Sequence, residues 1–265
     1  MTILTALPRL GTRPAVLRPR QPRLDHLPMM TRAAPAVLRR DGIDPAPIMA
    51  DNDRIGDCTA AGLANAVRAV SALNGFQTPV TTREVVAFYS ASTGYTPADP
   101  ASDRGGIETD VLAHAALHGY ALEAQTLYPL WGTIEPGHFN SLRLAVSALG
   151  VVYLGVELAI ADQAGLGGIW DTETPDSLGD RTPGSWGGHC LLLWAYDGTG
   201  DEDTVTLLTW GTTQRATWRW LRSRMTEAHG LLWPQLASPA PSFLSVTDIA
   251  LIRSANTAFL NGTLV

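Results

Sequence analysis

The sequence predicts an α+β protein in which a helical half precedes an antiparallel strand half, with a cleft between the two halves. Two observations support this prediction. Apolar side chains recur at helical spacing between residues 58 and 118. Strand-like apolar runs then dominate between residues 151 and 210. We therefore expect the second half to form an antiparallel sheet or barrel against which the helices pack.

Composition divides the 265 residues into three parts. Residues 1–45 are expected to form an extended arm, residues 46–234 one globular domain, and residues 235–265 a C-terminal extension. The apolar content of 45% and the eight tryptophans are enough for a substantial core in the middle part. The extension contains an amphipathic piece, VTDIALIRSANTAFL, which we expect to pack on the body or on a partner.

The arm is basic and rich in proline. Residues 1–40 hold eight arginines and one acid, Asp25, so they carry +7; the net charge of −6 leaves −13 for the rest of the chain. Such an arm can lie along its own acidic body, bind a partner protein or touch nucleic acid. Because no aromatic side chains are interleaved with the arginines to stack on bases, nucleic acid is the least favoured of these.

The sequence gives no sign of export or of membrane insertion. No run of 18 apolar residues occurs, and the first 16 residues lack the apolar core of a signal peptide. Two cysteines are too few for a disulfide framework. We therefore expect a cytoplasmic protein that makes no membrane contact.

Three helices are expected in the first half, over residues 58–74, 82–92 and 107–118. Asp57 stands at the N-cap position of the first helix, and Glu84 lies in the first turn of the second. These signals agree with the apolar spacing, so the first two helices are each predicted from two independent features.

Residues 151–159, 190–197 and 203–210 are predicted strands in the second half. Residues 215–221 can form a further strand or a short helix. Glycine and proline dominate between residues 165 and 188, which indicates a long loop.

Cys58 is the first candidate for chemistry. It follows the polar, loop-like segment NDRIGD and begins the first predicted helix, so its thiol is expected at a helix N-terminus. The positive end of a helix lowers the pKa of a cysteine and raises the fraction of reactive thiolate. The alternative is a buried structural cysteine, but the polar approach favours a position facing a cleft.

His189 is the second candidate, 131 residues downstream, in the segment GGHC at the mouth of a buried strand. An imidazole placed there can act as a general base, although a histidine satisfied within the core is the alternative. Cys190 should point to the opposite face of the strand and be structural. His114 and His118 have the spacing of a metal pair, but no further ligand completes a site, so we expect neither a metal nor a cofactor.

The order of these features resembles the papain-like cysteine proteases, over about residues 45–234. Gly105-Gly106 is similar to the double glycine of that family, and LTWG (208–211) to its Asn-Ser-Trp-Gly. The resemblance implies that Asn52 replaces the family's oxyanion glutamine and that Trp210 shields the histidine. The pattern NDRIGDC…GGHC…TWG is also similar to uncharacterised actinobacterial and bacteriophage proteins.

Two positions depart from the family's pattern. Thr59 follows the nucleophile where papain has tryptophan, and Leu208 stands where the family has the asparagine that orients the imidazole. Thr209 is expected to point to the opposite strand face from that asparagine position, and Asp197 to reach back only if a loop allows it. These two residues are nevertheless the candidates for orienting His189.

The resemblance implies a cysteine peptidase or related amide hydrolase acting on a peptide or protein. In this reading Cys58 attacks the carbonyl, the Cys58 N–H and the Asn52 amide hold the oxyanion, and His189 transfers the proton. A cell-wall amidase is a variant that the long cysteine-to-histidine interval disfavours. The arm could then serve as an inhibitory propeptide.

A papain-like scaffold without activity is the alternative function. Such a protein would serve in assembly, for example as a capsid- or tail-associated virion component of a bacteriophage. Leu208 favours this alternative because leucine cannot orient an imidazole. The arm and the C-terminal extension favour it as well, because segments of this kind join proteins to an assembly.

Overall fold

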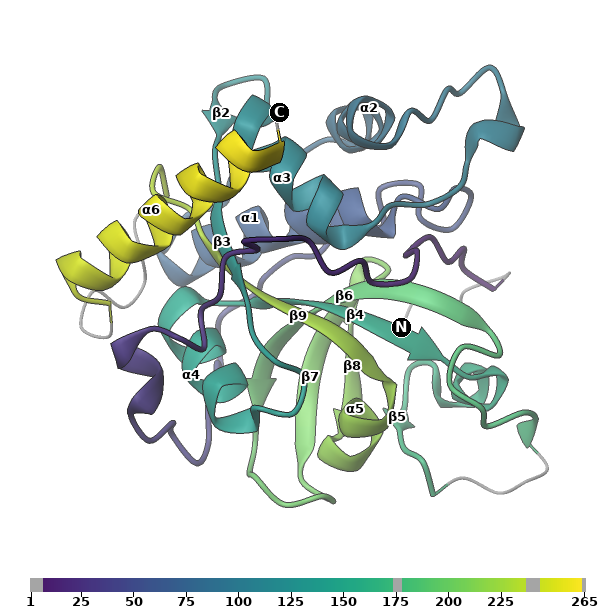
Figure 1. Cartoon of the computed structure of the whole chain (residues 1–265). Coiled ribbons are helices and arrows are strands. Elements are labelled where there is room, and N and C mark those ends of the chain that lie inside the picture. Colours follow the sequence, from purple (N-terminus) through teal and green to yellow (C-terminus); the bar gives the residue numbers. More distant parts are fainter. Residues whose placement is uncertain (1–6, 174–177, 237–243, 264–265) are drawn as a thin grey trace.

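The computed structural model describes residues 7–173, 178–236 and 244–263 (Figure 1). The first six residues of the predicted arm lie outside the described residues, as do residues 237–243 and 264–265 of the predicted extension. Among the described residues, no helix is both long enough and apolar enough to cross a bilayer.

A seven-stranded sheet forms the frame of the molecule. Its strands are β3 (Leu130–Thr133), β4 (Val152–Leu158), β5 (Ile169–Trp170), β6 (Gly187–Tyr196), β7 (Thr204–Thr209), β8 (Thr212–Thr217) and β9 (Met225–Leu232). The spatial order is β3-β9-β4-β6-β7-β8-β5, and all neighbours pair antiparallel except β5 with β8. Two short strands, β1 (Tyr120–Ala121) and β2 (Thr126–Leu127), pair separately.

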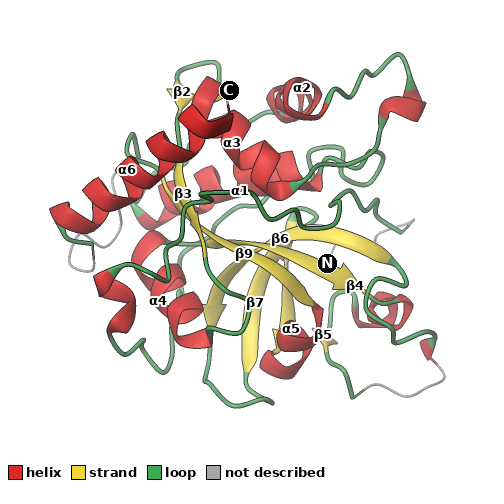
Figure 2. Cartoon of the chain, in the orientation of Figure 1, coloured by secondary structure: helices red, strands yellow, loops and turns green. Residues whose placement is uncertain are grey.

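Helices cover both faces of this sheet (Figure 2). The α-helices are α1 (Cys58–Leu73), α2 (Thr82–Thr93), α3 (Glu108–His118), α4 (Phe139–Leu149), α5 (Trp218–Arg224) and α6 (Val246–Thr263). The 3-10 helices are η1 (Pro28–Thr31), η2 (Pro100–Ser102) and η3 (Ile160–Gly165). Helices α1 to α3 share one core with the sheet, and α4 and α5 share the other. Helix α6 packs against β3 and α3.

Strand side chains alternate between the two cores, as the pleat of a strand requires. Tyr153 and Leu192 are fully buried with the helices α1 to α3. Leu154 and Leu191, one position away on the same strands, are buried with α4 and α5. The sheet therefore separates two apolar layers, which explains why β4 and β6 are nearly continuous apolar runs in the sequence.

The predicted α+β class is confirmed, and the three predicted helices form. Helix α2 begins with a capping box in which the Thr81 hydroxyl accepts from the Glu84 N–H while the Glu84 carboxylate accepts from the Thr81 N–H. The segment 215–221 contains both predicted structures, since β8 ends at Thr217 and α5 begins at Trp218. Helix α4 and strand β9 were not predicted.

The N-terminal arm lies along its own body among the described residues. In Figure 1 its dark trace crosses the molecule below α3 and above the strands of the sheet. Arg18 forms an ion pair with Asp110 of α3 at 2.6 Å. Leu24 and Met30 are buried in the core shared with α4. The basic arm thus pairs with an acidic side chain of the body and also contributes apolar side chains to the core.

Candidate active site

Cys58 is the first residue of α1, as the sequence predicts, but its thiol is covered. The residue is 1% exposed, and the Thr12 hydroxyl of the arm lies 3.3 Å from Sγ. Burial raises the pKa of the Cys58 thiol to about 12, because an anion is poorly solvated in the interior. In this arrangement Cys58 is a neutral thiol, not the thiolate that an open helix N-terminus favours.

The segment covering Cys58 is held by backbone hydrogen bonds on both sides. The Thr12 N–H donates to the Gly188 carbonyl at 3.1 Å. On the other side, the Gly106 N–H donates to the Gly11 carbonyl at 2.8 Å, and the Arg13 N–H donates to the Gly106 carbonyl at 2.9 Å. The arm therefore crosses Cys58 as an extended peptide that bridges the start of α3 and the start of β6.

Glycines allow this close approach. A Cβ added at Gly11 would overlap the carbonyl group of Gly56, and one added at Gly188 would overlap the Thr12 carbonyl. Gly105 has a φ of +71°, a conformation that L side chains rarely adopt, and a Cβ there would overlap the Gly11 carbonyl. The space over Cys58 therefore has room for the backbone of the arm only if residue 11 is a glycine.

His189 lies near the start of β6 and is 1% exposed. Its Nε2 is 2.6 Å from the Thr209 hydroxyl, and its ring stacks on Trp210 with centroids 4.1 Å apart and an angle of 18°. Its Nδ1 has no hydrogen-bond partner among the described residues. Burial lowers the pKa of His189 to about 3, so the imidazole is neutral here.

The expectation that Thr209 points away from the histidine was wrong. Leu208 pairs with Leu192 across β6 and β7, and both side chains enter the core beneath α1. Thr209, one position further, therefore lies on the other face of the sheet, which is the face of His189. The match of LTWG to the family's Asn-Ser-Trp-Gly places the orienting position at Leu208, one residue before the side chain that bonds the imidazole.

Asp197 does not orient His189, which corrects the other sequence expectation. It follows the last residue of β6, eight positions from His189, and one strand of that length spans about 26 Å. Its carboxylate accepts hydrogen bonds from the N–H and the hydroxyl of Thr204, at 2.7 and 2.8 Å. Arg215 lies 3.6 Å from the same carboxylate. Asp197 thus belongs to the far end of the sheet.

Asn52 lies close to the arm and is 2% exposed. Its side-chain amide donates to the Ile55 carbonyl at 3.2 Å, while its own backbone carbonyl accepts from the Arg9 N–H at 3.0 Å. The side chain is therefore held in the loop before Cys58. Cys190 is buried in the core beside α1, where the sulfur would contact a Cβ added at Gly62.

Asp57 occupies the N-cap position of α1, but its side chain caps no backbone N–H. The residue is fully buried, and neither carboxylate oxygen has a hydrogen-bond partner among the described residues. Burial, together with the nearby Asp51, raises the pKa of Asp57 to about 8. A protonated acid therefore lies directly before Cys58 at neutral pH.

The Asp57→Asn variant should lose part of the pH dependence of stability. Because the folded-state pKa of Asp57 exceeds its ordinary value, its contribution is fully present below about pH 4 and is lost as pH rises through about 8. Urea unfolding at pH 5 and pH 8 should show a fall in unfolding free energy that is smaller in the variant by up to a few kcal/mol. The exposed Asp53→Asn change is the control. Equal falls in the wild type and in Asp57→Asn would contradict the assignment.

Comparisons with solved structures identify the fold. No protein-family model and no curated protein matches the chain. Its structure is similar to xylellain, a cysteine protease from Xylella fastidiosa, with a TM-score of 0.62 and 12% identity over 87% of this chain and 99% of that one. It is also similar to a digestive procathepsin L 3 of Tenebrio molitor, with a TM-score of 0.49 and 15% identity over 85% and 75%. The similarity to xylellain confirms that the fold is papain-like.

Proposed function

We propose that the protein is a papain-like cysteine peptidase that its own N-terminal residues hold in a latent state. The observation that carries this proposal is the extended segment of residues 11–13 across Cys58. Its backbone is hydrogen-bonded by Gly106 on one side and Gly188 on the other. A cleft that holds residues 11–13 through backbone hydrogen bonds is suited to hold an extended substrate peptide in the same manner. Cys58 lies at the floor of this cleft.

Displacement of the arm would restore solvent to both catalytic side chains. The Cys58 thiol would then lie at the open N-terminus of α1, where the helix dipole favours a thiolate. His189 would accept the thiol proton at Nδ1, the nitrogen that has no partner, while Thr209 holds Nε2 and Trp210 covers the ring. Thr209 is thus a positioning residue for the imidazole.

The proposed reaction is acyl transfer. The Cys58 thiolate attacks a peptide carbonyl, and the Cys58 N–H and the Asn52 amide stabilise the oxyanion. His189 gives its proton to the leaving amine, which breaks the C–N bond and leaves a thioester. Water, deprotonated by His189, then hydrolyses the thioester and regenerates the thiol.

An inactive papain-like scaffold with an assembly role is the second candidate. The observation that favours it is the burial of both Cys58 and His189, with pKa values that keep both side chains neutral. The argument from Leu208 no longer supports it, since Thr209 bonds the imidazole. The comparisons give no support to a bacteriophage or actinobacterial origin.

The experiment that separates the two candidates is a hydrolysis assay on a complex peptide mixture, read by mass spectrometry. The protein carries Gly11→Leu, which should displace the arm because position 11 has no room for a side chain. We expect new cleavage products that disappear when Cys58→Ala is added. Identical peptide patterns with and without Cys58→Ala would reject the peptidase and favour the scaffold.

A further inference from the structure

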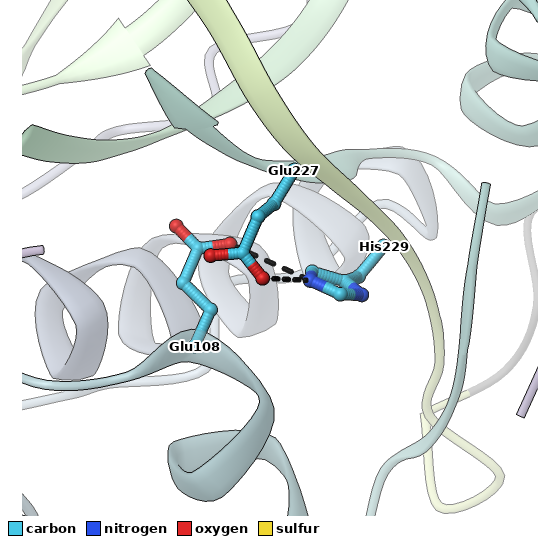
Figure 3. A group of neighbouring side chains, drawn as sticks. All are labelled: Glu108, Glu227 and His229. Carbon is cyan, nitrogen blue, oxygen red and sulfur yellow. Dashed lines mark hydrogen bonds and ion pairs between the residues drawn. The ribbon is translucent and has the colours of Figure 1, made fainter. Parts of the chain in front are cut away.

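Three buried side chains meet between α3 and the sheet, apart from Cys58 and His189 (Figure 3). Glu108 is the first residue of α3, and Glu227 and His229 occupy alternate positions on β9. Their candidate ligand atoms all lie within 4.8 Å of one another. In the part of the chain that the structure describes, this is the one such group of three or more histidine, cysteine or acidic side chains.

The carboxylates in this group lack the partners that burial demands. Glu108 is fully buried and Glu227 is 6% exposed. Both oxygens of Glu108 and Oε1 of Glu227 have no nitrogen or oxygen hydrogen-bond partner among the described residues, and the buried Cys190 thiol is the weak donor beside Glu108. Figure 3 shows the two carboxylates and the imidazole pointing toward one another. Two buried carboxylates facing each other cannot both be ionised unless a cation neutralises them.

The spacing suits a single small cation. His229 Nε2 lies 3.4 Å from Glu227 Oε2 and 3.7 Å from Glu108 Oε2. Zinc binds histidine nitrogen and carboxylate oxygen at about 2.0–2.2 Å, so two tetrahedral ligands stand about 3.3 Å apart. All three separations are below 4.8 Å and would have to close toward this spacing for the side chains to hold the ion.

The surroundings of the cluster support the same ligand set. Thr133 Oγ1 lies 3.1 Å from His229 Nδ1, so it can accept the Nδ1 proton and leave Nε2 as the donor to a metal. Gly155 lies opposite Glu227 on β4, and a Cβ there would come within 3.0 Å of Glu108 Oε1. A glycine at this position leaves space for the two carboxylates.

We propose that Glu108, Glu227 and His229 bind one divalent metal ion, with zinc as the best match and the fourth coordination position left to a water molecule or to a second carboxylate oxygen. Two carboxylates and a neutral imidazole around a dication have no net charge, which removes the unpaired buried charge. The ion would tie the first turn of α3 to β9. Because Glu108 follows Gly106 by two residues, it would also brace the wall of the peptide cleft. The proposal does not require the peptidase activity.

The site is closed to solvent, so the ion would enter during folding. The test is therefore to unfold the untagged full-length protein with a chelator, refold it with zinc chloride and a thiol reductant, and remove free metal by desalting. Zinc per chain is then measured by mass spectrometry of the element, and melting temperature by calorimetry. Glu108→Gln and His229→Gln are the test variants, and the exposed Glu157→Gln is the matched control.

We expect close to one zinc per wild-type chain and per Glu157→Gln chain, and at least a tenfold lower content in the two test variants. Refolding with zinc should raise the melting temperature of the wild type, a result that stands even if a variant fails to fold. Zinc content equal in wild type and Glu108→Gln would place the metal elsewhere. Retention of no zinc by the wild type would mean that a shared proton satisfies the cluster. Either result overturns the proposal.

Discussion

Replacing Gly11 by leucine is expected to raise the rate of iodoacetamide alkylation at Cys58 by at least about 10-fold and at most about 10,000-fold. The new side chain would overlap Gly56 and push the arm out of the cleft. With a pKa of about 12 the thiolate fraction at pH 8 is about 1 in 10,000. At the free cysteine value of about 8.5 the fraction is about a quarter, an increase of about 2500-fold, and a pKa below 8.5 takes the increase toward about 10,000-fold. Alkylation is followed by peptide mass spectrometry.

The control for this variant is Gly137→Leu, because Gly137 faces open space and has no unusual φ. Its alkylation rate should equal that of the wild type. If Gly11→Leu also labels at the wild-type rate while remaining folded, the arm does not restrict access to Cys58. The latent state proposed here would then be wrong.

Removing the imidazole is expected to have the second large effect. In the Gly11→Leu background, His189→Ala should lower kcat/KM for peptide hydrolysis by a factor on the order of 100 to 10,000, the range for a lost general acid–base group. The reason is that no other imidazole contacts Trp210 or Thr209 among the described residues, so nothing replaces its proton transfer. The measurement uses a peptide identified in the hydrolysis assay.

His118→Ala is the matched control, since His118 is exposed at the end of α3. It should leave kcat/KM within about twofold of the parent, as surface changes usually do. Equal losses in both histidine variants, or none in His189→Ala, would remove His189 from the mechanism.

The sequence predicted the elements whose periodicity is long and unambiguous. Helix α1 has apolar residues at helical spacing and ends before Asn74-Gly75. The capping residues Thr81 and Glu84 mark the start of α2. Strand β9 was missed because its sequence, MTEAHGLL, contains acidic, histidine and glycine positions. Glu227 and His229 face the buried Glu108 rather than water, a contact that the strand's own sequence does not indicate.

The candidate site was predictable in its main residues but not in its state. Cys58 and His189 stand out by their flanking sequences, whereas the register of β7 against β6 decides between Leu208 and Thr209. A slip of one residue reverses every side chain of a strand, so sequence alone placed Thr209 on the wrong face.

The covering arm could not be foreseen in detail. Nothing in the basic segment RLGTRP distinguishes Gly11 and Thr12 from other loop residues. Gly11 and Thr12 contact Gly56, Gly105 and Gly188, which are distant in sequence and close only in the folded chain. The raised pKa of Cys58 follows from this coverage and therefore was not predictable either.

The pH dependence of Cys58 alkylation in the Gly11→Leu protein, with and without His189→Ala, tests the central claim most directly. If Cys58 and His189 form a thiolate–imidazolium pair, the apparent pKa of Cys58 lies below the free value of about 8.5. This pKa rises when His189 is removed. An apparent pKa at or above about 8.5 that does not change with His189→Ala would contradict the account. The protein would then be a papain-like scaffold without a working dyad.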